Sequence, residues 1–122
     1  MLAAAEFDKI VEGALRRIAP RFRRQMKNVA IVVEPEPPHP SLLGLYQGRP
    51  LTHRSVFETF AMPDKITIYQ GPHERLAESR EQLEQMVVDT VWHEIAHHFG
   101  MDEPQVRHAE RRRAASRRKR TP

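Results

Sequence analysis

The chain is organised around the stretch His93-Glu94-Ile95-Ala96-His97-His98-Phe99-Gly100-Met101-Asp102-Glu103. It contains the pattern H-E-x-x-H, in which His93 and His97 stand four residues apart. On an α-helix, residues at this spacing share one face, with Cβ atoms about 5–6 Å apart. Two imidazoles placed in this way can bind one cation, so the stretch predicts a helix that carries a metal site.

Zinc suits this pair of imidazoles, since it accepts their nitrogens readily. A catalytic zinc site keeps three protein ligands and leaves the fourth position to water. Glu94 is offset around the helix from His93, where its carboxylate can approach that water as a general base. The pattern therefore predicts His93 and His97 as zinc ligands and Glu94 as the catalytic residue.

A third ligand has to come from beyond the helix. Gly100 follows three residues after His97 and is expected to end the helix in a left-handed cap. The chain can then turn back and present the carboxylate of Glu103, with Asp102 as the alternative. The competing interpretation is a surface helix whose two histidines have no function. The glycine, the acidic pair and an apolar helix face argue against it.

Composition limits the remaining possibilities. A chain of 122 residues forms one domain, and a hydrophobic content of 39% with a mean hydropathy of −0.64 predicts no membrane span. The N-terminus has no basic region typical of a signal peptide, so a cytoplasmic location is the default expectation. Because there is no cysteine, a metal must be held by His, Asp or Glu.

Charge is unevenly distributed. Residues 107–122 hold eight Lys or Arg against one acid, Glu110, whereas residues 1–106 hold 12 against 15 acids. We therefore predict a domain over residues 1–106 and a basic C-terminal helix or tail over 107–122. The tail could contact nucleic acid or an acidic partner, but it has no interleaved aromatic residues to stack on bases. A solvated tail that aids solubility is the alternative.

Apolar periodicity and, over residues 105–118, helix propensity alone predict four helices. Helices are expected over residues 3–19, just after Pro20, over 74–99 as one long helix, and over 105–118. Strands are expected over 29–33, 42–46 and 65–69, with a further short strand near Val56 and Phe57 in a loop over 51–62. The strand over 29–33 is expected at the centre of the sheet.

The strand over 65–69 alternates cleanly. Ile66 and Ile68 are expected to face inward, and Lys65, Thr67 and Tyr69 outward. A strand with a polar outer face that is followed by proline is typical of a sheet edge. An extended peptide could then pair with it.

Four stretches in this order carry a family resemblance: V-A-I-V-V-E at 29–34, L-L-G-L-Y-Q-G at 42–48, P-D-K-I-T-I-Y at 63–69 and H-E-I-A-H-H-F-G at 93–100. Together they resemble the small bacterial zincin-like metallopeptidase family, a minimal zincin once described as a domain of unknown function. The resemblance covers roughly residues 5–106. It implies an α+β fold, with a small mixed sheet packed against an N-terminal helix and a long metal-binding helix. It also implies that zinc is bound by His93, His97 and Glu103. At the position of Glu103 the family usually has aspartate.

The leading hypothesis is thus a zinc-dependent metallopeptidase, which hydrolyses peptide bonds of a peptide or protein substrate through a zinc-bound water with Glu94 as general base. A zinc-binding domain without efficient protease activity is one alternative, and an interaction protein that uses its basic tail on nucleic acid is another. The sequence does not specify an oligomeric state.

Several side chains outside the motif are candidates for a place in the site. Tyr46, Tyr69 and His73 are possible donors to the oxyanion, although a structural role is favoured for each. His98 is expected to be packed or hydrogen-bonded, because it points about 100° away from His97. Asp89 could orient a ligand imidazole but is favoured as surface, and His39 and His53 receive no role.

Overall fold

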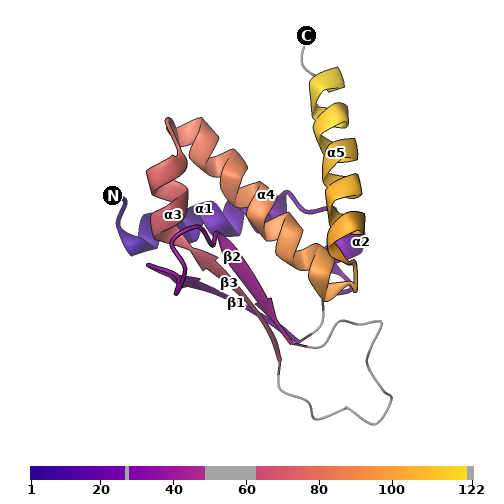
Figure 1. Cartoon of the computed structure of the whole chain (residues 1–122), viewed down its shortest axis with the longest axis horizontal. Helices are drawn as coiled ribbons and strands as arrows, with labels where there is room; N and C mark the ends of the chain where they lie inside the picture. Colours follow the sequence, from indigo (N-terminus) through magenta and orange to yellow (C-terminus); the bar gives the residue numbers. More distant parts are fainter. Residues whose placement is uncertain (27, 49–62, 121–122) are drawn as a thin grey trace.

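The computed structural model describes residues 1–26, 28–48 and 63–120, apart from the side chains of 103 and 117–120. The predicted α+β class is confirmed, because one small mixed sheet packs beside a set of helices (Figure 1). The elements in chain order are α1 (Ala4–Arg16), α2 (Pro20–Arg23), β1 (Val29–Glu34), β2 (Gly44–Gln47), β3 (Asp64–Tyr69), α3 (Gln70–Leu76), α4 (Arg80–His98) and α5 (Glu103–Arg120). The strand expected near residues 56–57 lies outside the described part of the chain.

The order of strands in the described sheet is β1-β3-β2. Strand β3 pairs in parallel with β1 and antiparallel with β2, so that Thr67 lies between Val32 and Leu45. The predicted edge strand is therefore central, and the strand predicted to be central lies at the end of the described sheet. A peptide cannot pair with β3, because both of its edges are already hydrogen-bonded.

The alternation of β3 was misleading because both of its faces are covered. Ile66 and Ile68 are fully buried, as predicted, but Thr67 and Tyr69 are only 3% and 6% exposed. Only Lys65 behaves as an outward residue of this strand. Strand β1, by contrast, is half-buried over most of its length, in keeping with its position at the end of the described sheet.

Helices α1 and α4 supply most of the apolar core that packs on Ile66 and Ile68 (Figure 1). Their buried side chains recur at spacings of three and four, the pattern of a helix with one apolar face. Those of α1 are Phe7, Ile10, Val11 and Ala14, and those of α4 include Leu83, Val87, Val91 and Ile95. The core thus holds α4 against the sheet and fixes the direction in which its polar face points.

The helix predicted over residues 74–99 is in fact two helices, α3 and α4. The break comes at Ser79, whose hydroxyl accepts a hydrogen bond from the backbone N–H of Gln82 at 3.0 Å. The side chain of Gln82 in turn accepts from the backbone N–H of Glu78. Such reciprocal capping starts a new helix at this point. Helix α3 begins at Gln70, directly where β3 ends.

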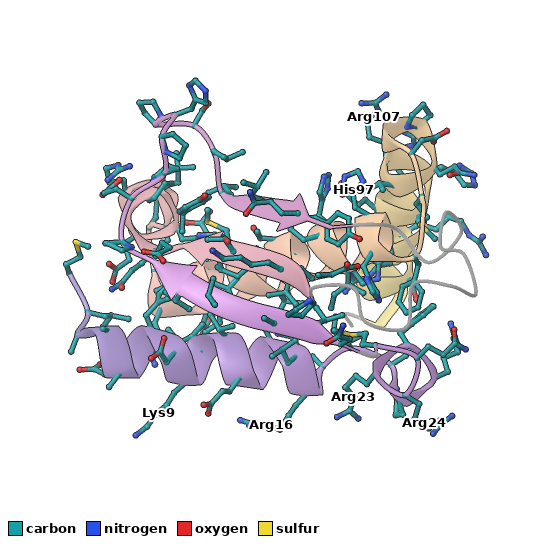
Figure 2. All side chains as sticks on the ribbon, turned by 90° about the horizontal axis from the view of Figure 1, so that it is seen from below. Lys9, Arg16, Arg23, Arg24, His97 and Arg107 are labelled. Atoms are coloured by element: carbon teal, nitrogen blue, oxygen red, sulfur yellow. The ribbon has the colours of Figure 1, made fainter. Side chains whose placement is uncertain are left out.

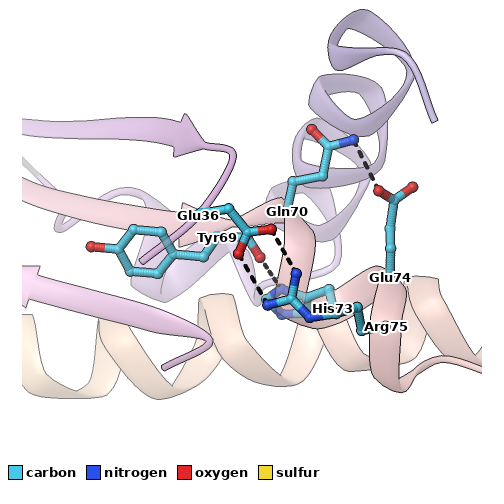
Figure 3. Close-up of polar contacts among 6 residues, drawn as sticks. All are labelled: Glu36, Tyr69, Gln70, His73, Glu74 and Arg75. Carbon is cyan, nitrogen blue, oxygen red and sulfur yellow. Dashed lines mark hydrogen bonds and ion pairs between the residues drawn. The ribbon is translucent and has the colours of Figure 1, made fainter. Parts of the chain in front are cut away.

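Helix α3 is tied to the segment after β1 by a two-pronged ion pair (Figure 3). The guanidinium of Arg75 donates to both carboxylate oxygens of Glu36, at 2.6 and 3.0 Å. These bonds lower the pKa of the Glu36 carboxyl below its ordinary value. Gly71 leaves room for this ion pair, because a Cβ at residue 71 would overlap the Glu36 carboxylate.

The remaining helices follow the predicted pattern. Helix α1 ends three residues before the predicted limit, α2 starts at Pro20, and α5 extends the helix predicted over 105–118 by two residues at each end. In the described part of the chain, no helix is both long enough and apolar enough to cross a membrane.

Candidate metal centre

His93 and His97 face each other from successive turns of α4, and their Nε2 atoms lie 3.3 Å apart. The other ring nitrogen of each is occupied. His97 Nδ1 lies 3.1 Å from the backbone carbonyl oxygen of Met101, and His93 Nδ1 lies 2.5 Å from a carboxylate oxygen of Glu110. Since both oxygens are acceptors, each Nδ1 carries the proton and donates it. In the neutral form of each ring, Nε2 then presents a lone pair.

Two lone pairs at this distance repel each other unless a proton or a metal cation lies between them. Tetrahedral zinc binds imidazole nitrogen at about 2.0–2.1 Å, which places two ligand nitrogens about 3.3–3.4 Å apart. The observed separation of 3.3 Å fits that arrangement. The tautomers fit as well, because metal-binding histidines usually donate their second N–H to a carboxylate or a carbonyl. The residues present therefore suit zinc.

The end of α4 places the carbonyl that orients His97. Gly100 has φ of 88°, the left-handed conformation that glycine adopts without a Cβ penalty. Its N–H donates to His97 O, and the N–H of Met101 donates to Ala96 O. These two bonds form a Schellman cap, which is the left-handed helix end predicted from the position of Gly100. The cap turns the chain so that Met101 O reaches His97 Nδ1.

Glu94 lies beside the two histidines on α4 and is only 8% exposed. Strand β2 approaches it closely at Gly44. A Cβ at Gly44 would lie 2.7 Å from Thr90 Cγ2 and 3.2 Å from Glu94 Cγ, so only glycine allows this approach. The side chain of Glu94 thus lies close to the first residue of β2.

The third ligand predicted from the sequence, Glu103, is the first residue of α5, and its side chain is outside the described part of the structure. The alternative, Asp102, caps α5. Its carboxylate accepts from the N–H of Gln105 at 2.9 Å, and its own N–H donates to the Gln105 side chain at 2.8 Å. Among the described side chains, no group of three His, Asp or Glu could hold a metal ion.

Glu110 is the residue of this site that sequence reasoning missed. It belongs to the segment predicted as a basic tail, yet helix α5 brings it to His93 (2.5 Å). Val106, one turn earlier, is fully buried, which seats the start of α5 on the body of the molecule. The sequence feature that could have indicated its role is that Glu110 is the one acidic residue in the segment 107–122, which also contains eight Lys or Arg residues.

The three candidate oxyanion donors have other contacts. Tyr46 donates its hydroxyl to Asp64 at 2.6 Å, and Tyr69 is almost entirely buried. His73 is fully buried, with Nδ1 donating to Tyr69 O at 2.6 Å (Figure 3) and Nε2 accepting from the Thr90 hydroxyl at 2.8 Å. Burial lowers the pKa of His73 below its ordinary value. All three contribute to the structure around the site.

His98 is packed and hydrogen-bonded, as predicted. It is fully buried, and its Nδ1 lies 2.7 Å from the carboxylate of Asp64 on β3. The same carboxylate oxygen accepts from Tyr46 on β2, so one buried acid joins α4 to both strands. Among the described residues His98 Nε2 has no hydrogen-bond partner. Asp89, in contrast, is exposed and accepts from Gln85 at 2.9 Å.

A groove of about 760 Å³ runs past the two motif residues His93 and Glu94. It has three walls. One face of α4 contributes Met86, Asp89, Thr90, His93 and Glu94, the segment that leads into β2 contributes Ser41, Leu42, Leu43 and Gly44, and α5 contributes Arg107, Glu110, Arg111, Arg113 and Ala114. The groove therefore gives a ligand of peptide size access to the motif.

Comparisons with known proteins identify a family and a similar fold. The sequence profile of a family described as zincin-like metallopeptidase matches residues 26–113. A solved structure, a conserved hypothetical protein from Thermo thermophilus, is similar with a TM-score of 0.53 and 29% sequence identity, over 79% of this chain and 92% of that one. No curated protein matches the chain. The matched region includes Glu110 as well as the H-E-x-x-H motif.

Proposed function

The chain belongs to the zincin-like metallopeptidase family, and from that premise we propose that it is a zinc-dependent peptidase whose active site is the centre on α4. One observation carries the proposal more than any other. The Nε2 atoms of His93 and His97 lie 3.3 Å apart, and each ring is oriented by a hydrogen-bond acceptor behind it. This is the arrangement that a pair of zinc-binding imidazoles needs.

We assign the ligands as His93, His97 and Glu103. Asp102 is committed to capping α5, which favours its neighbour as the third ligand. When bound, zinc would lower the pKa of a water molecule and polarise the carbonyl of a peptide bond. The chain itself would supply the proton transfers around that chemistry.

Glu94 is the residue proposed for those transfers. It follows His93 directly on α4, lines the groove, and is held in place by the close approach of β2 at Gly44. Its carboxylate would take a proton from the attacking water and deliver it to the departing amine. Its low exposure keeps bulk water from competing for that proton.

The experiment measures zinc content and peptide cleavage for the wild type, Glu94→Gln and Glu103→Ala. Glu94→Gln is expected to keep its zinc and to lose about 100-fold or more in cleavage rate, because it removes the general base. Glu103→Ala is expected to lose zinc. Glu81→Gln, the same change on an exposed residue of α4, is the matched control and should change neither quantity.

Two results would contradict the proposal. If the zinc-loaded wild type cleaves neither casein nor any member of a peptide library, the protein is a zinc-binding domain without protease activity. Equal cleavage rates for the wild type and Glu94→Gln would remove Glu94 from the catalytic role.

A further inference from the structure

The wall of the groove formed by α5 carries positive charge. Arg107, Glu110, Arg111 and Ala114 all line the groove, and their spacings of three, four and seven put them on one face of the helix. Glu110 reaches back to His93, so this face is anchored at the metal centre. The two arginines stand on either side of that anchor.

These two arginines are available to a ligand. Both are exposed, and within the described part of the chain neither has an ion-pair partner. Arg113, which also lines the groove, differs from them, because its guanidinium lies 4.8 Å from the centre of the Trp92 ring. The groove has three acids too, but Glu110 is bonded to His93 and Glu94 is assigned to proton transfer. The third, Asp89, belongs to the wall formed by α4.

The α5 arginines are separate from the other basic surface of the molecule. Figure 2 shows Arg107 on the same side as the metal-site residue His97. The labelled basic side chains of α1, α2 and the turn after α2 lie on the opposite side: Lys9, Arg16, Arg23 and Arg24. The labelled basic side chains of α1, α2 and the turn after α2 are therefore separate from Arg107, which lines the groove.

We propose that the peptidase groove selects acidic peptides, with Arg107 and Arg111 as the residues that determine specificity. This inference rests on the proposed function. Two guanidiniums one helical turn apart match two carboxylates on a peptide that lies along α5, and each can bind a carboxylate through paired N–H donors. An acidic side chain on the α5 side of the cleaved bond would meet Arg107 or Arg111, whereas a basic one would be repelled by them.

The test is the binding of fluorescein-labelled peptides to zinc-loaded Glu94→Gln, followed by anisotropy. Three peptides of one length carry Glu, Gln or Lys at the same two positions. Each exposed ion pair is worth a few-fold in affinity, so the Glu peptide is expected to bind about five- to tenfold more tightly than the Gln peptide. The Lys peptide is expected to bind most weakly, and added salt should reduce the differences.

Variants then assign the preference to α5. Replacing both residues by alanine, Arg107→Ala with Arg111→Ala, should bring the Glu peptide to the affinity of the Gln peptide. Replacing both by glutamate should make the Lys peptide the tightest. Arg112→Ala is the matched control, because Arg112 is exposed on the same helix but does not line the groove. It should leave the ranking of the three peptides unchanged.

The outcomes separate this inference from the proposed function. If the wild type cleaves peptides without preferring acidic ones, or if Arg112→Ala acts like the double variant, the inference fails while the peptidase stands. If the wild type cleaves nothing but Glu94→Gln still binds the Glu peptide through Arg107 and Arg111, the peptidase fails and the acidic-peptide site stands. Equal binding of all three peptides overturns the inference in either case.

Discussion

In the proposed metal centre, Glu110 and the carbonyl of Met101 determine which nitrogen of each histidine is presented to zinc. A carboxylate oxygen of Glu110 lies 2.5 Å from His93 Nδ1, and the carbonyl oxygen of Met101 lies 3.1 Å from His97 Nδ1. Each oxygen accepts a hydrogen bond from the nitrogen it faces. Without such partners an imidazole can change tautomer or rotate, and both changes take its lone pair away from the metal. We therefore expect the zinc affinity of this centre to depend on Glu110 and Met101, which are not proposed as ligands.

Loss of Glu110 should weaken zinc binding without abolishing it. We expect Glu110→Ala to lower zinc affinity about 10- to 100-fold, the usual effect of removing a group that supports a ligand histidine. Glu110→Gln, whose amide oxygen can still accept from His93 Nδ1, should lose less. Competition with a chromogenic chelator measures both. If Glu110→Ala binds zinc as tightly as the wild type, Glu110 has no role in orienting His93.

His73 should make stability depend on pH. Its native pKa is lowered by burial, so the unfolded chain binds a proton more readily than the folded one. The contribution to stability is complete above about pH 6.5 and is lost as the pH falls toward the lowered native value, by at most about 1.4 kcal/mol per pH unit. Urea unfolding at pH 7.5 and 5.5 should show a smaller loss for His73→Gln than for the wild type.

The control for this experiment is His39→Gln, because His39 is an exposed loop residue. It should lose as much stability as the wild type over the same range. A loss in His73→Gln that equals the wild-type loss would show that other groups account for the pH dependence.

Between elements, the distance from β2 to α4 is set by Gly44. We expect Gly44→Ala to lower the free energy of unfolding by about 1–3 kcal/mol, because its Cβ would lie 2.7 Å from Thr90 Cγ2 and force the strand away from the helix. Activity should fall with it, since the shift moves the wall beside Glu94. Thermal unfolding and peptide cleavage measure the two effects.

Gly13 on α1 provides the matched control. A Cβ there would meet its nearest neighbour at 3.7 Å, an ordinary contact, and alanine favours the helix. Gly13→Ala should therefore stabilise the protein by about 0.5–1 kcal/mol. Equal effects of the two substitutions would show that the close approach at Gly44 carries no strain.

The elements themselves were largely predictable, whereas their order in the sheet was not. Periodicity located α1 through Phe7 and Ile10, and β-branched residues located β1. The burial of Thr67 and Tyr69 was not predicted, because a polar or amphipathic residue in an alternating pattern is expected to be exposed. Ser79 was missed as a helix start because glutamates at helical spacing, from Glu74 to Glu84, continue on both sides of it.

At the scale of the whole molecule, the candidate residues that lie within one turn of α4 were predictable from the sequence. The residue that the fold brings to them from another helix was not. His93, Glu94 and His97 follow from spacing alone. Glu110 lies seventeen residues beyond His93, and its position depends on the angle at which α5 returns after Gly100 and Asp102. The boundary predicted at residue 106 stays a prediction, and α5 crosses it without a break.

Zinc should stabilise the whole fold, because the centre connects α4 to the start of α5. A ligand that binds only the native state stabilises it by about 2.7 kcal/mol at 100 times its dissociation constant. We expect a chelator to lower Tm, and one equivalent of zinc to restore it. His93→Ala is expected to unfold at the same temperature with and without zinc, which a scanning calorimeter can establish.

The central claim is that Nε2 of His93 and of His97 bind one zinc ion. X-ray absorption at the zinc edge on purified protein tests it most directly. We expect one zinc per chain, with two imidazole nitrogens at about 2.0–2.1 Å and oxygen ligands completing the shell. Zinc that remains bound in His93→Ala or His97→Ala with an unchanged spectrum, or a wild type that binds no zinc, would contradict it.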